Sequence, residues 1–255
     1  MPKSTSWDEA ARWYEKLLSG EGTYQSQVIL PNLIRLLEIK KGEVILDIAC
    51  GLGFFADKIS SAGAKVIGVD ISKGLLDIAK KNSSTEIIYH VSPAHKMPFI
   101  KNMSIDKAIL IFAIQNIENA QAALNEAIRV LKSRGKLFIV MNHPAFRIPK
   151  ESSWGWDETN KIQYRRIDRY LSESKVKIQT HPGERPNAYT LSFHRPLQFY
   201  FKALRKAGFF VSRLEEWNSN RKSETGPRST AENTARKEIP LFLALEAIKA
   251  RIGDN

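Results

Sequence analysis

The sequence is poor in cysteine and in long apolar runs. Cys50 is its single cysteine, which excludes an internal disulfide and any zinc site built from several thiolates. No stretch reaches the roughly 18 to 20 apolar residues that a membrane-spanning helix needs. The first residues lack the apolar segment of a secretory signal, and no His, Cys and Asp cluster stands at metal-ligand spacing. We therefore expect a cytoplasmic protein without a membrane span and without a metal.

Acidic residues are also outnumbered: 27 Asp and Glu stand against 39 Lys and Arg, which gives a formal net charge of +12. The basic residues are spread along the chain, and their longest runs are doublets such as Lys40-Lys41 and Arg165-Arg166. A nucleic-acid-binding protein more often gathers such residues on one face or tail. We therefore favour a basic solvated surface, with RNA or an anionic small substrate as alternative reasons for the charge.

Short apolar segments alternate with helical patterns along much of the chain. We interpret the short segments as buried strands and the patterns with 3.6-residue spacing as helices. Continuous apolar strands separated by helices are typical of a parallel sheet that is covered on both faces. The expected strands span residues 44–46, 66–70, 87–91, 108–112, 136–142, 210–217 and 240–248, and the expected helices span 7–19, 24–38, 53–62, 72–81, 120–131 and 197–206.

The alternation stops after residue 143 and resumes near residue 193. A length of 255 residues fits one large α/β domain with an insertion. The inserted stretch is rich in Trp, Tyr, Arg and Pro, and long irregular stretches of this kind are usually functional or mobile. We divide the single domain into N-terminal cap helices (1–40), a core (41–143), a substrate-side insertion (144–192) and the C-terminal part of the sheet (193–255).

Residues 47–53 (DIACGLG) predict a glycine turn between a buried strand and a helix. Glycine adopts backbone angles closed to other residues and lets a ligand touch the main chain. Asp70 ends the second strand, where a carboxylate can accept hydrogen bonds from both ribose hydroxyls of a nucleoside. Two alternatives remain: the glycines serve packing alone, and Asp70 only complements the dipole of the following helix.

The glycine turn lacks the third glycine of a dinucleotide-binding loop, because residues 54–56 (FFA) follow it. Together, residues 47–53 and 68–72 (GVDIS) resemble the class I S-adenosylmethionine (SAM)-dependent methyltransferases, in the UbiE-like type 11 group. The resemblance covers about residues 40–142. It implies a Rossmann-like α/β fold with a seven-stranded, mostly parallel sheet, helices on both faces, a reversed last hairpin and the insertion after strand 5.

The resemblance also implies SAM as the cofactor and S-adenosylhomocysteine (SAH) as the product. Residues 94–99 resemble the family's loop over the adenine, although Pro93 stands where the family has an Asp; Ser92 or the loop backbone is expected to replace it. Residues 115–116 (QN) stand where the family often has two histidines. The expected cofactor-binding residues are Asp47 (for the ammonium group), Ala49, Cys50, Gly51, Gly53, Asp70, Ile71, Leu75, Ala94, His95, Phe112 and Tyr24.

His143 and His194 are the candidate catalytic residues. His143 closes the fifth expected strand, and His194 re-enters the domain after the insertion, so both are expected at the active edge of the sheet. An unperturbed pKa near 6.5 suits histidine to the role of general base or substrate contact. The alternative for His143 is a histidine that caps the strand end and bonds a nearby carbonyl.

The substrate side is expected to combine a cation with aromatic side chains. Arg147 can bind an anionic substrate group as a bidentate fork, or can instead pair with Asp157 or Glu158. The aromatic residues of the insertion either wall an apolar acceptor or form the small core on which the insertion folds. Tyr14 and Tyr24 either close over SAM or pack the N-terminal helices. The expected substrate-binding residues are Tyr14, Arg147, Trp154, Trp156 and Tyr164.

These observations predict an enzyme that transfers a methyl group to an O or N atom of a small-molecule acceptor, as a monomer or homodimer. The net charge suggests an RNA methyltransferase as an alternative, although no Asn-Pro-Pro-Tyr-like motif follows the fourth strand. The departures at Pro93 and residues 115–116 suggest a second alternative, a non-catalytic SAM-binding regulatory protein.

Overall fold

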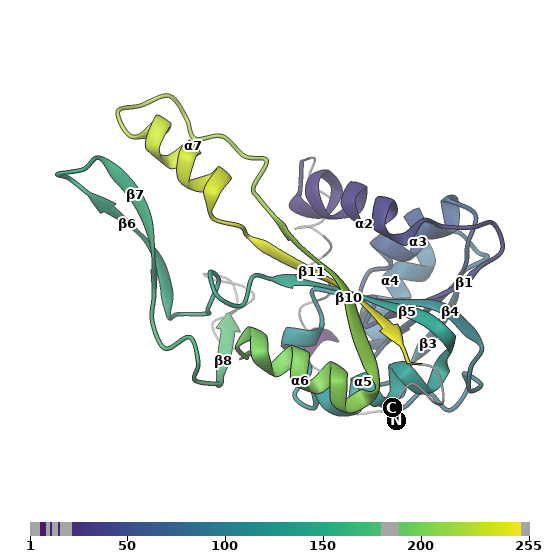
Figure 1. The fold of residues 1–255 in the computed structure, drawn as a ribbon. Coiled ribbons are helices and arrows are strands. Elements are labelled where there is room, and N and C mark those ends of the chain that lie inside the picture. The colour runs from purple at the N-terminus through teal and green to yellow at the C-terminus, as the bar shows by residue number, and fades with distance from the viewer. Residues whose placement is uncertain (1–5, 9–10, 12–14, 16–21, 180–188, 251–255) are drawn as a thin grey trace.

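A seven-stranded sheet forms the centre of the computed structural model, which describes residues 6–8, 11, 15, 22–179 and 189–250 (Figure 1). The strand order is β10-β11-β5-β4-β1-β2-β3. Strands β1 to β5 are parallel, and β11 pairs antiparallel with both β5 and β10. The expected Rossmann-like sheet with a reversed last hairpin is confirmed. Its strands are β1 (Val44–Ile48), β2 (Lys65–Asp70), β3 (Ile88–Val91), β4 (Ile105–Ile111), β5 (Leu131–Asn142), β10 (Phe209–Trp217) and β11 (Phe242–Lys249).

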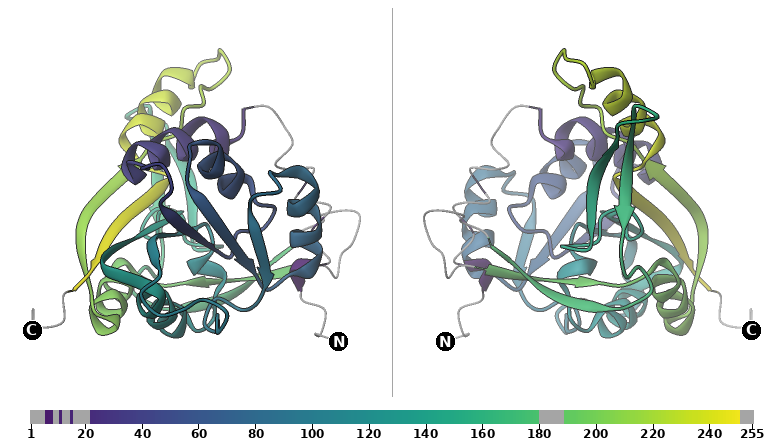
Figure 2. Two further views of the ribbon diagram at one scale, coloured as in Figure 1. Left: turned by 90° about the vertical axis from the view of Figure 1, so that its right-hand side faces the viewer. Right: turned by 90° about the vertical axis from the view of Figure 1, so that its left-hand side faces the viewer.

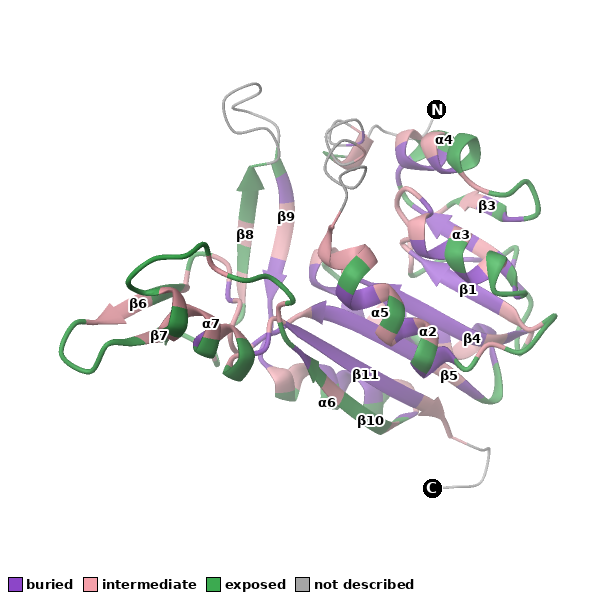
Figure 3. Cartoon of the chain, turned by 90° about the horizontal axis from the view of Figure 1, so that it is seen from above, coloured by how far each residue is buried: buried purple, intermediate pink, exposed green. Residues whose placement is uncertain are grey.

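Helices cover both faces of this sheet because neighbouring residues of each buried strand point to opposite sides. Ile45 packs with α2, α3 and α4 on one face, and Leu46 packs with α5 and α6 on the other. Figure 1 shows the strands between these two helix layers, and Figure 3 shows that the central strands are largely buried. The helices are η1 (Gln25–Ile29, a π-helical turn), α2 (Leu30–Leu37), α3 (Phe54–Ser61), α4 (Lys73–Asn82), α5 (Ala120–Val130) and α6 (Leu197–Ala207).

Local signals explain where several helices begin and end. The Ser72 hydroxyl accepts a hydrogen bond from the Leu75 amide and caps α4, as predicted. Gly208 ends α6 at a φ of 97°, in the left-handed region that favours glycine. The helix expected over residues 7–19 lies mostly outside the described residues. No helix in the described part of the chain is long and apolar enough to cross a membrane.

The insertion contains two hairpins that the sequence did not predict. Hairpin β6–β7 pairs Ser152–Asp157 with Ile162–Ile167, and hairpin β8–β9 pairs Ser174–Gln179 with Tyr189–His194. Most of their residues remain exposed or half-buried, so the two-residue apolar alternation that marks a strand is weak. Both hairpins stand outside the central sheet (Figure 2).

Two further elements differ from expectation. Helix α7 (Ser229–Glu238) lies in the polar segment 218–237, where no helix was predicted, and it packs against β7. It buries Ala235 alone, so its apolar face is too small to be seen in the sequence. Strand β5 begins five residues earlier than predicted; Arg134, at a φ of 60°, is an irregularity inside the strand.

Candidate active site

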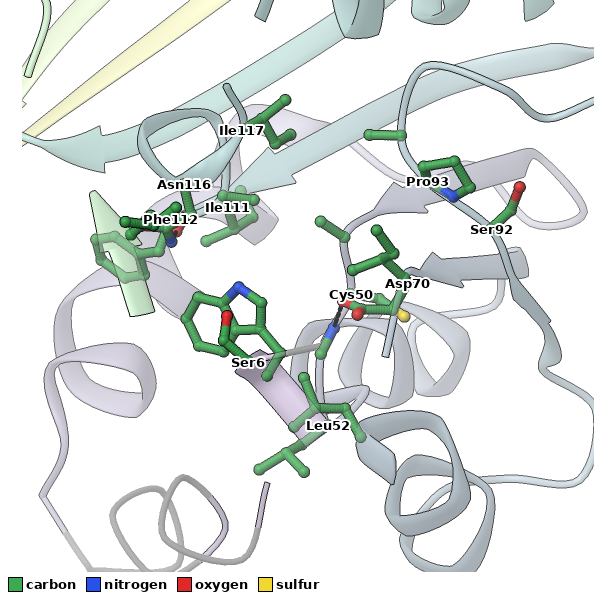
Figure 4. A pocket seen from close by; sticks show the side chains of 18 of the residues that line it. Ser6, Cys50, Leu52, Asp70, Ser92, Pro93, Ile111, Phe112, Asn116 and Ile117 are labelled. Atoms are coloured by element: carbon green, nitrogen blue, oxygen red, sulfur yellow. Dashed lines mark hydrogen bonds between the residues drawn. The ribbon is translucent and has the colours of Figure 1, made fainter. Parts of the chain in front are cut away.

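A cavity of about 500 Å³ opens at the carboxyl ends of β1, β2 and β4; we call it the first cavity (Figure 4). Its wall is built mainly from the loops that follow β1, β2, β3 and β4, and η1, α3, α4, Ser6, Trp7 and Leu191 also contribute to it. The strand order reverses beside β1, which is where open α/β sheets bind ligands. Its volume lies within the roughly 300–1,000 Å³ typical of small-molecule sites.

The loop after β1 is a tight turn of left-handed residues. Ala49, Gly51 and Gly53 have φ values of 56°, 55° and 74°. Ala49 carries a Cβ in this region, a strained conformation that is often found at functional sites. Ala49, Cys50 and Gly51 line the cavity, whereas Gly53 does not. A Cβ on Gly53 would lie 2.4 Å from the Tyr89 hydroxyl, so this glycine is required for packing.

Asp70 lies on the cavity wall with both carboxylate oxygens anchored. Its Oδ2 accepts the Gly51 amide at 2.9 Å (Figure 4), and its Oδ1 accepts the Ser72 amide at 2.8 Å. Burial raises the pKa of Asp70, and these two backbone amides oppose the rise. Each oxygen keeps further lone pairs for hydroxyl donors of a ligand.

Asp47 is buried at the end of β1. Its Oδ2 has no hydrogen-bond partner among the described residues. Burial and the charge of Asp70 raise the pKa of Asp47 well above its usual range. A buried carboxylate oxygen without a partner is costly, and an ammonium group would relieve the cost. The carboxylates of Asp47 and Asp70 therefore fit a nucleoside that carries an amino-acid arm.

The single thiol shares this environment. Burial, Asp47 and Asp70 together raise the pKa of Cys50 well above its usual range. The thiol therefore stays protonated near neutral pH, which argues against Cys50 as a nucleophile. Cys50 lines the cavity as a small neutral group.

The rest of the wall comes from two facing loops. After β3, the loop contributes Ser92, Pro93, Ala94 and His95. After β4, Phe112 has a φ of 54° and is therefore a second non-glycine residue in the left-handed region on this wall. The two loops lie on opposite sides of the cavity in Figure 4. A flat apolar ring system can be enclosed between them.

Comparison with known proteins agrees with this geometry. A family model described as a methyltransferase domain matches residues 46–139. A demethylmenaquinone methyltransferase of Paenarthrobacter aurescens is 28% identical over 187 residues, covering 73% of this chain and 68% of that protein. An uncharacterized protein of Haemophilus influenzae is 30% identical over 172 residues, covering 64% and 67%. Other relatives are named ubiquinone/menaquinone biosynthesis C-methyltransferase or demethylmenaquinone methyltransferase, and this chain spans about half of their length.

The fold is shared with solved structures. An S-adenosylmethionine-dependent methyltransferase from Mesorhizobium loti superposes with a TM-score of 0.71 at 24% identity, covering 89% of this chain and 100% of that one. The chain belongs to the class I SAM-dependent methyltransferases. SAM is the cofactor of this methyltransferase, and its methyl group is the electrophile of the reaction.

The methyltransferase brings most of the expected cofactor residues to the first cavity. Three of them do not line it. Asp47 is buried at the end of β1, Gly53 packs on Tyr89, and Tyr24 is also absent from the wall. The Tyr24 ring contacts Phe242 at 5.3 Å. The expected residues on the wall are Ala49, Cys50, Gly51, Asp70, Ile71, Leu75, Ala94, His95 and Phe112.

A second cavity of about 410 Å³ adjoins the first, and Trp7 and Asn116 line both. Most of its wall belongs to the insertion, which supplies Arg147 and Arg165 among others. Arg147 makes no ion pair with Asp157 or Glu158. Of the two alternatives for Arg147, the ion pair with an acid of the insertion is absent, and the side chain instead faces the second cavity as a cation.

The two candidate catalytic histidines line neither cavity. His143 is 3% exposed; its Nε2 lies 2.7 Å from Glu216 Oε1, and its Nδ1 accepts the Ala145 amide. His194 is equally buried, with Nε2 2.8 Å from the Tyr170 carbonyl oxygen. His143 does follow the carboxyl end of β5, but both rings have internal partners and face neither cavity, so the geometry favours structural roles over the expected catalytic ones.

The expected aromatic wall also lies elsewhere. Trp154, Trp156 and Tyr164 belong to hairpin β6–β7 and line neither cavity. Tyr164 covers Gly155 across the hairpin, where a Cβ would meet its ring at 2.3 Å. Trp156 packs under the Arg228 guanidinium at 4.6 Å. These residues build the hairpin, which was the alternative reading; Tyr14 lies outside the described residues.

Sequence reasoning missed residues that tertiary contacts bring to the site. Trp7 was read only as part of a helix face, but the Asp8 carboxylate accepts the Gly74 amide at 2.8 Å and brings this segment to α4. Asn116 was noted only as a departure from the family pattern. Arg165 was read as part of a surface doublet. No local pattern marks these three, because their partners are distant in sequence.

Proposed function

We propose that this methyltransferase transfers the SAM methyl group to an O or N atom of a small-molecule acceptor bound in the second cavity. The supporting observation is the shared wall: Trp7 and Asn116 line both cavities, so an acceptor in the second can approach a cofactor in the first. Such alignment is the main contribution of the protein to an in-line displacement.

The chemistry of the second cavity supports an O or N acceptor. Its described lining residues are Arg, Asn, Ser, Thr, Trp, Ile and Pro, and none is a carboxylate, a histidine or a lysine. His143 and His194, the proposed bases, stand away from it. A carboxylic acid, a phenol or an amine can lose its proton without a strong protein base, whereas a carbon nucleophile needs more activation.

A ring carbon of a quinone precursor is the second candidate acceptor. Relatives named demethylmenaquinone methyltransferase and ubiquinone/menaquinone biosynthesis C-methyltransferase favour it. In either case the apolar side chains of Trp7, Ile148 and Ile178 in the second cavity can contact an aromatic ring.

The cofactor residues are tested by calorimetric titration with SAH. In Asp70→Asn the side chain keeps its size but loses its charge, and we expect SAH affinity to fall about 10- to 100-fold, as for hydrogen bonds to charged groups worth roughly 1.5–3 kcal/mol. Asp77→Asn is the matched control because Asp77 lies on exposed α4 surface in an ion pair with Lys73. Equal SAH affinity in both variants would remove Asp70 from the proposed site.

The acceptor class is tested with SAM that carries a carbon-13 methyl group and a panel of phenols, carboxylic acids, amines and quinols. The chemical shift of the transferred methyl distinguishes O-, N- and C-linked products. An O- or N-methyl product that disappears in Asp70→Asn supports the proposal, and a C-methyl product supports the quinone candidate. A parallel incubation contains RNA in place of the small acceptors. If the labelled methyl group were found only in RNA, both the O- or N-acceptor proposal and the quinone candidate would be overturned.

A further inference from the structure

Two guanidinium groups enter the second cavity without any acidic residue on its described wall. Arg147 follows β5, and Arg165 lies on β7 of the insertion. The other polar side chains of the wall are neutral amides and hydroxyls: Asn116, Asn142, Ser152, Thr190 and Ser192. The cavity therefore carries two positive charges and no compensating negative one.

Arg165 is held in place by neutral partners. Its Nε donates to the Phe146 carbonyl at 2.8 Å, and its Nη2 donates to the Ser152 hydroxyl at 2.8 Å. Its guanidinium lies 5.1 Å from the Trp154 ring centroid. These contacts leave N–H donors of the fork unused, since a guanidinium has five.

Arg147 has still fewer partners. Its guanidinium lies 5.9 Å from the Phe242 ring centroid, and within the described residues its side chain makes no hydrogen bond and no ion pair. Other arginines at comparable depth are neutralised or bonded: Arg129 pairs with Glu126, and Arg195 donates to three carbonyls. Arg147 thus differs from these arginines, which like it are at least partly buried in the described part of the chain.

The electrostatics agree with this geometry. Burial lowers the pKa of Arg147 and of Arg165, and the charge of Arg147 lowers the pKa of Arg165 further. Two partly desolvated like charges repel each other, and a dianion or carboxylate between them would remove that cost. Planar forks also match the oxygens of carboxylate and phosphate groups.

We propose that the methyl acceptor carries an anionic group, a carboxylate or a phosphate ester, which Arg147 and Arg165 bind in the second cavity. The acceptor then extends toward Asn116, where the two cavities adjoin. This inference rests on the proposed function for the identity of the ligand as acceptor, but the anion site can be measured without turnover.

The test uses the full chain saturated with SAH, titrated with benzoate, phenyl phosphate and the neutral benzamide, and followed by NMR. We expect at least one anion to bind about tenfold or more tightly than benzamide. Arg147→Gln and Arg165→Gln should each remove that preference, and their unchanged SAH affinity shows that they fold. Stronger binding of benzoate than of phenyl phosphate, or the reverse, identifies the preferred anion.

Arg166→Gln is the matched control. Arg166 neighbours Arg165 on β7, is exposed and pairs with Asp168 at 3.0 Å, so the control removes the same charge outside the cavity. The inference would be overturned if wild type showed no preference for an anion over benzamide. It would also be overturned if the preference survived in both Arg147→Gln and Arg165→Gln, or if Arg166→Gln reduced it equally. Anion binding with no turnover of any acceptor would instead count against the proposed function alone.

Discussion

At the scale of single residues, two carboxylates divide the work at the carboxyl edge of the sheet. Asp70 accepts two backbone amides and still faces the first cavity. Asp47 is more deeply buried, and one of its oxygens has no partner in the described chain. A hydroxyl donor suits Asp70 and a cation suits Asp47, because the first is already anchored and the second lacks a counter-charge. A single ligand that carries both a ribose and an ammonium group would satisfy both carboxylates.

The buried His143 predicts how stability depends on pH. Burial lowers the pKa of His143, and the bond to Glu216 opposes this only in part. The unfolded state, with a histidine pKa near 6.5, therefore takes up a proton before the folded state does as pH falls. Stability is full above about pH 6.5 and decreases below it. Urea unfolding measures this at pH 7.5 and 5.5: the free energy of unfolding should fall less between the two pH values in His143→Gln than in wild type.

Glu216→Gln provides the opposite comparison. Loss of the carboxylate removes a contribution that raises the pKa of His143, so acidification should destabilise this variant more steeply than wild type. If His143→Gln kept the wild-type pH slope, the buried histidine would not be the source of the dependence.

At the scale of elements, the segment between β4 and α5 shapes the wall that both cavities share. Its turn η2 (Ile114–Asn116) is fastened to β5 because Gln115 exchanges two hydrogen bonds with the Asn142 backbone, each 3.0 Å long. The Asn116 side chain donates to the Phe112 carbonyl at 2.9 Å. Gln115 and Asn116 thus hold this turn in place. Arg195, which lies between β9 and α6, is buried between the rings of Phe193 and Phe199 and also holds this segment.

Arg195 is expected to act as a positioning residue for this segment. It donates to the carbonyls of Ile114, Ile117 and Glu118, and a lysine cannot reach all three with one ammonium group. Arg195→Lys should lower the free energy of unfolding by about 1.5–3 kcal/mol and weaken SAH binding several-fold. Urea unfolding and calorimetry measure the two effects.

Arg205→Lys is the control for that variant, since Arg205 is an exposed residue in the last turn of α6, the helix that follows Arg195. It should leave both quantities near wild type. A stable Arg195→Lys protein with unchanged SAH affinity would show that the segment does not depend on this arginine.

At the scale of the whole molecule, the sheet carries two apolar cores while its carboxyl edge holds the site. Loops from four strands and the N-terminal segment line the first cavity, so a cofactor bound there would connect parts that are far apart in sequence. A ligand that binds only the folded state stabilises the molecule by mass action. Stability should therefore follow cofactor concentration.

SAH at about 100 times its Kd should stabilise the folded protein by about 2.7 kcal/mol. For a domain of this size, about 2–4 °C per kcal/mol is expected, so the thermal midpoint should rise by roughly 5–10 °C. Differential scanning fluorimetry checks this, with Asp70→Asn expected to show a smaller rise and Arg166→Gln the full rise. No rise in wild type would contradict the assignment of the first cavity to the cofactor.

The sequence by itself determined the central α/β unit. The apolar segments at Val44–Ile48 and Lys65–Asp70, the glycine turn between them and the cap at Ser72 are local signals, and each acts over a few residues. Because local periodicity and turn chemistry decide such elements, the sheet and most of the cofactor wall were predictable. The family resemblance added the reversed β10–β11 hairpin.

The second cavity and the hairpins of the insertion depend on tertiary contacts and could not be predicted from local patterns. Hairpin β6–β7 is half exposed on both faces, so its apolar pattern is weak, and Arg165 enters the cavity only because the hairpin folds back on residues 146–152. His143 and His194 looked catalytic from their positions, yet burial and internal hydrogen bonds occupy both rings. Contacts between residues distant in sequence leave no trace in local periodicity, and these contacts determine which charges face the second cavity.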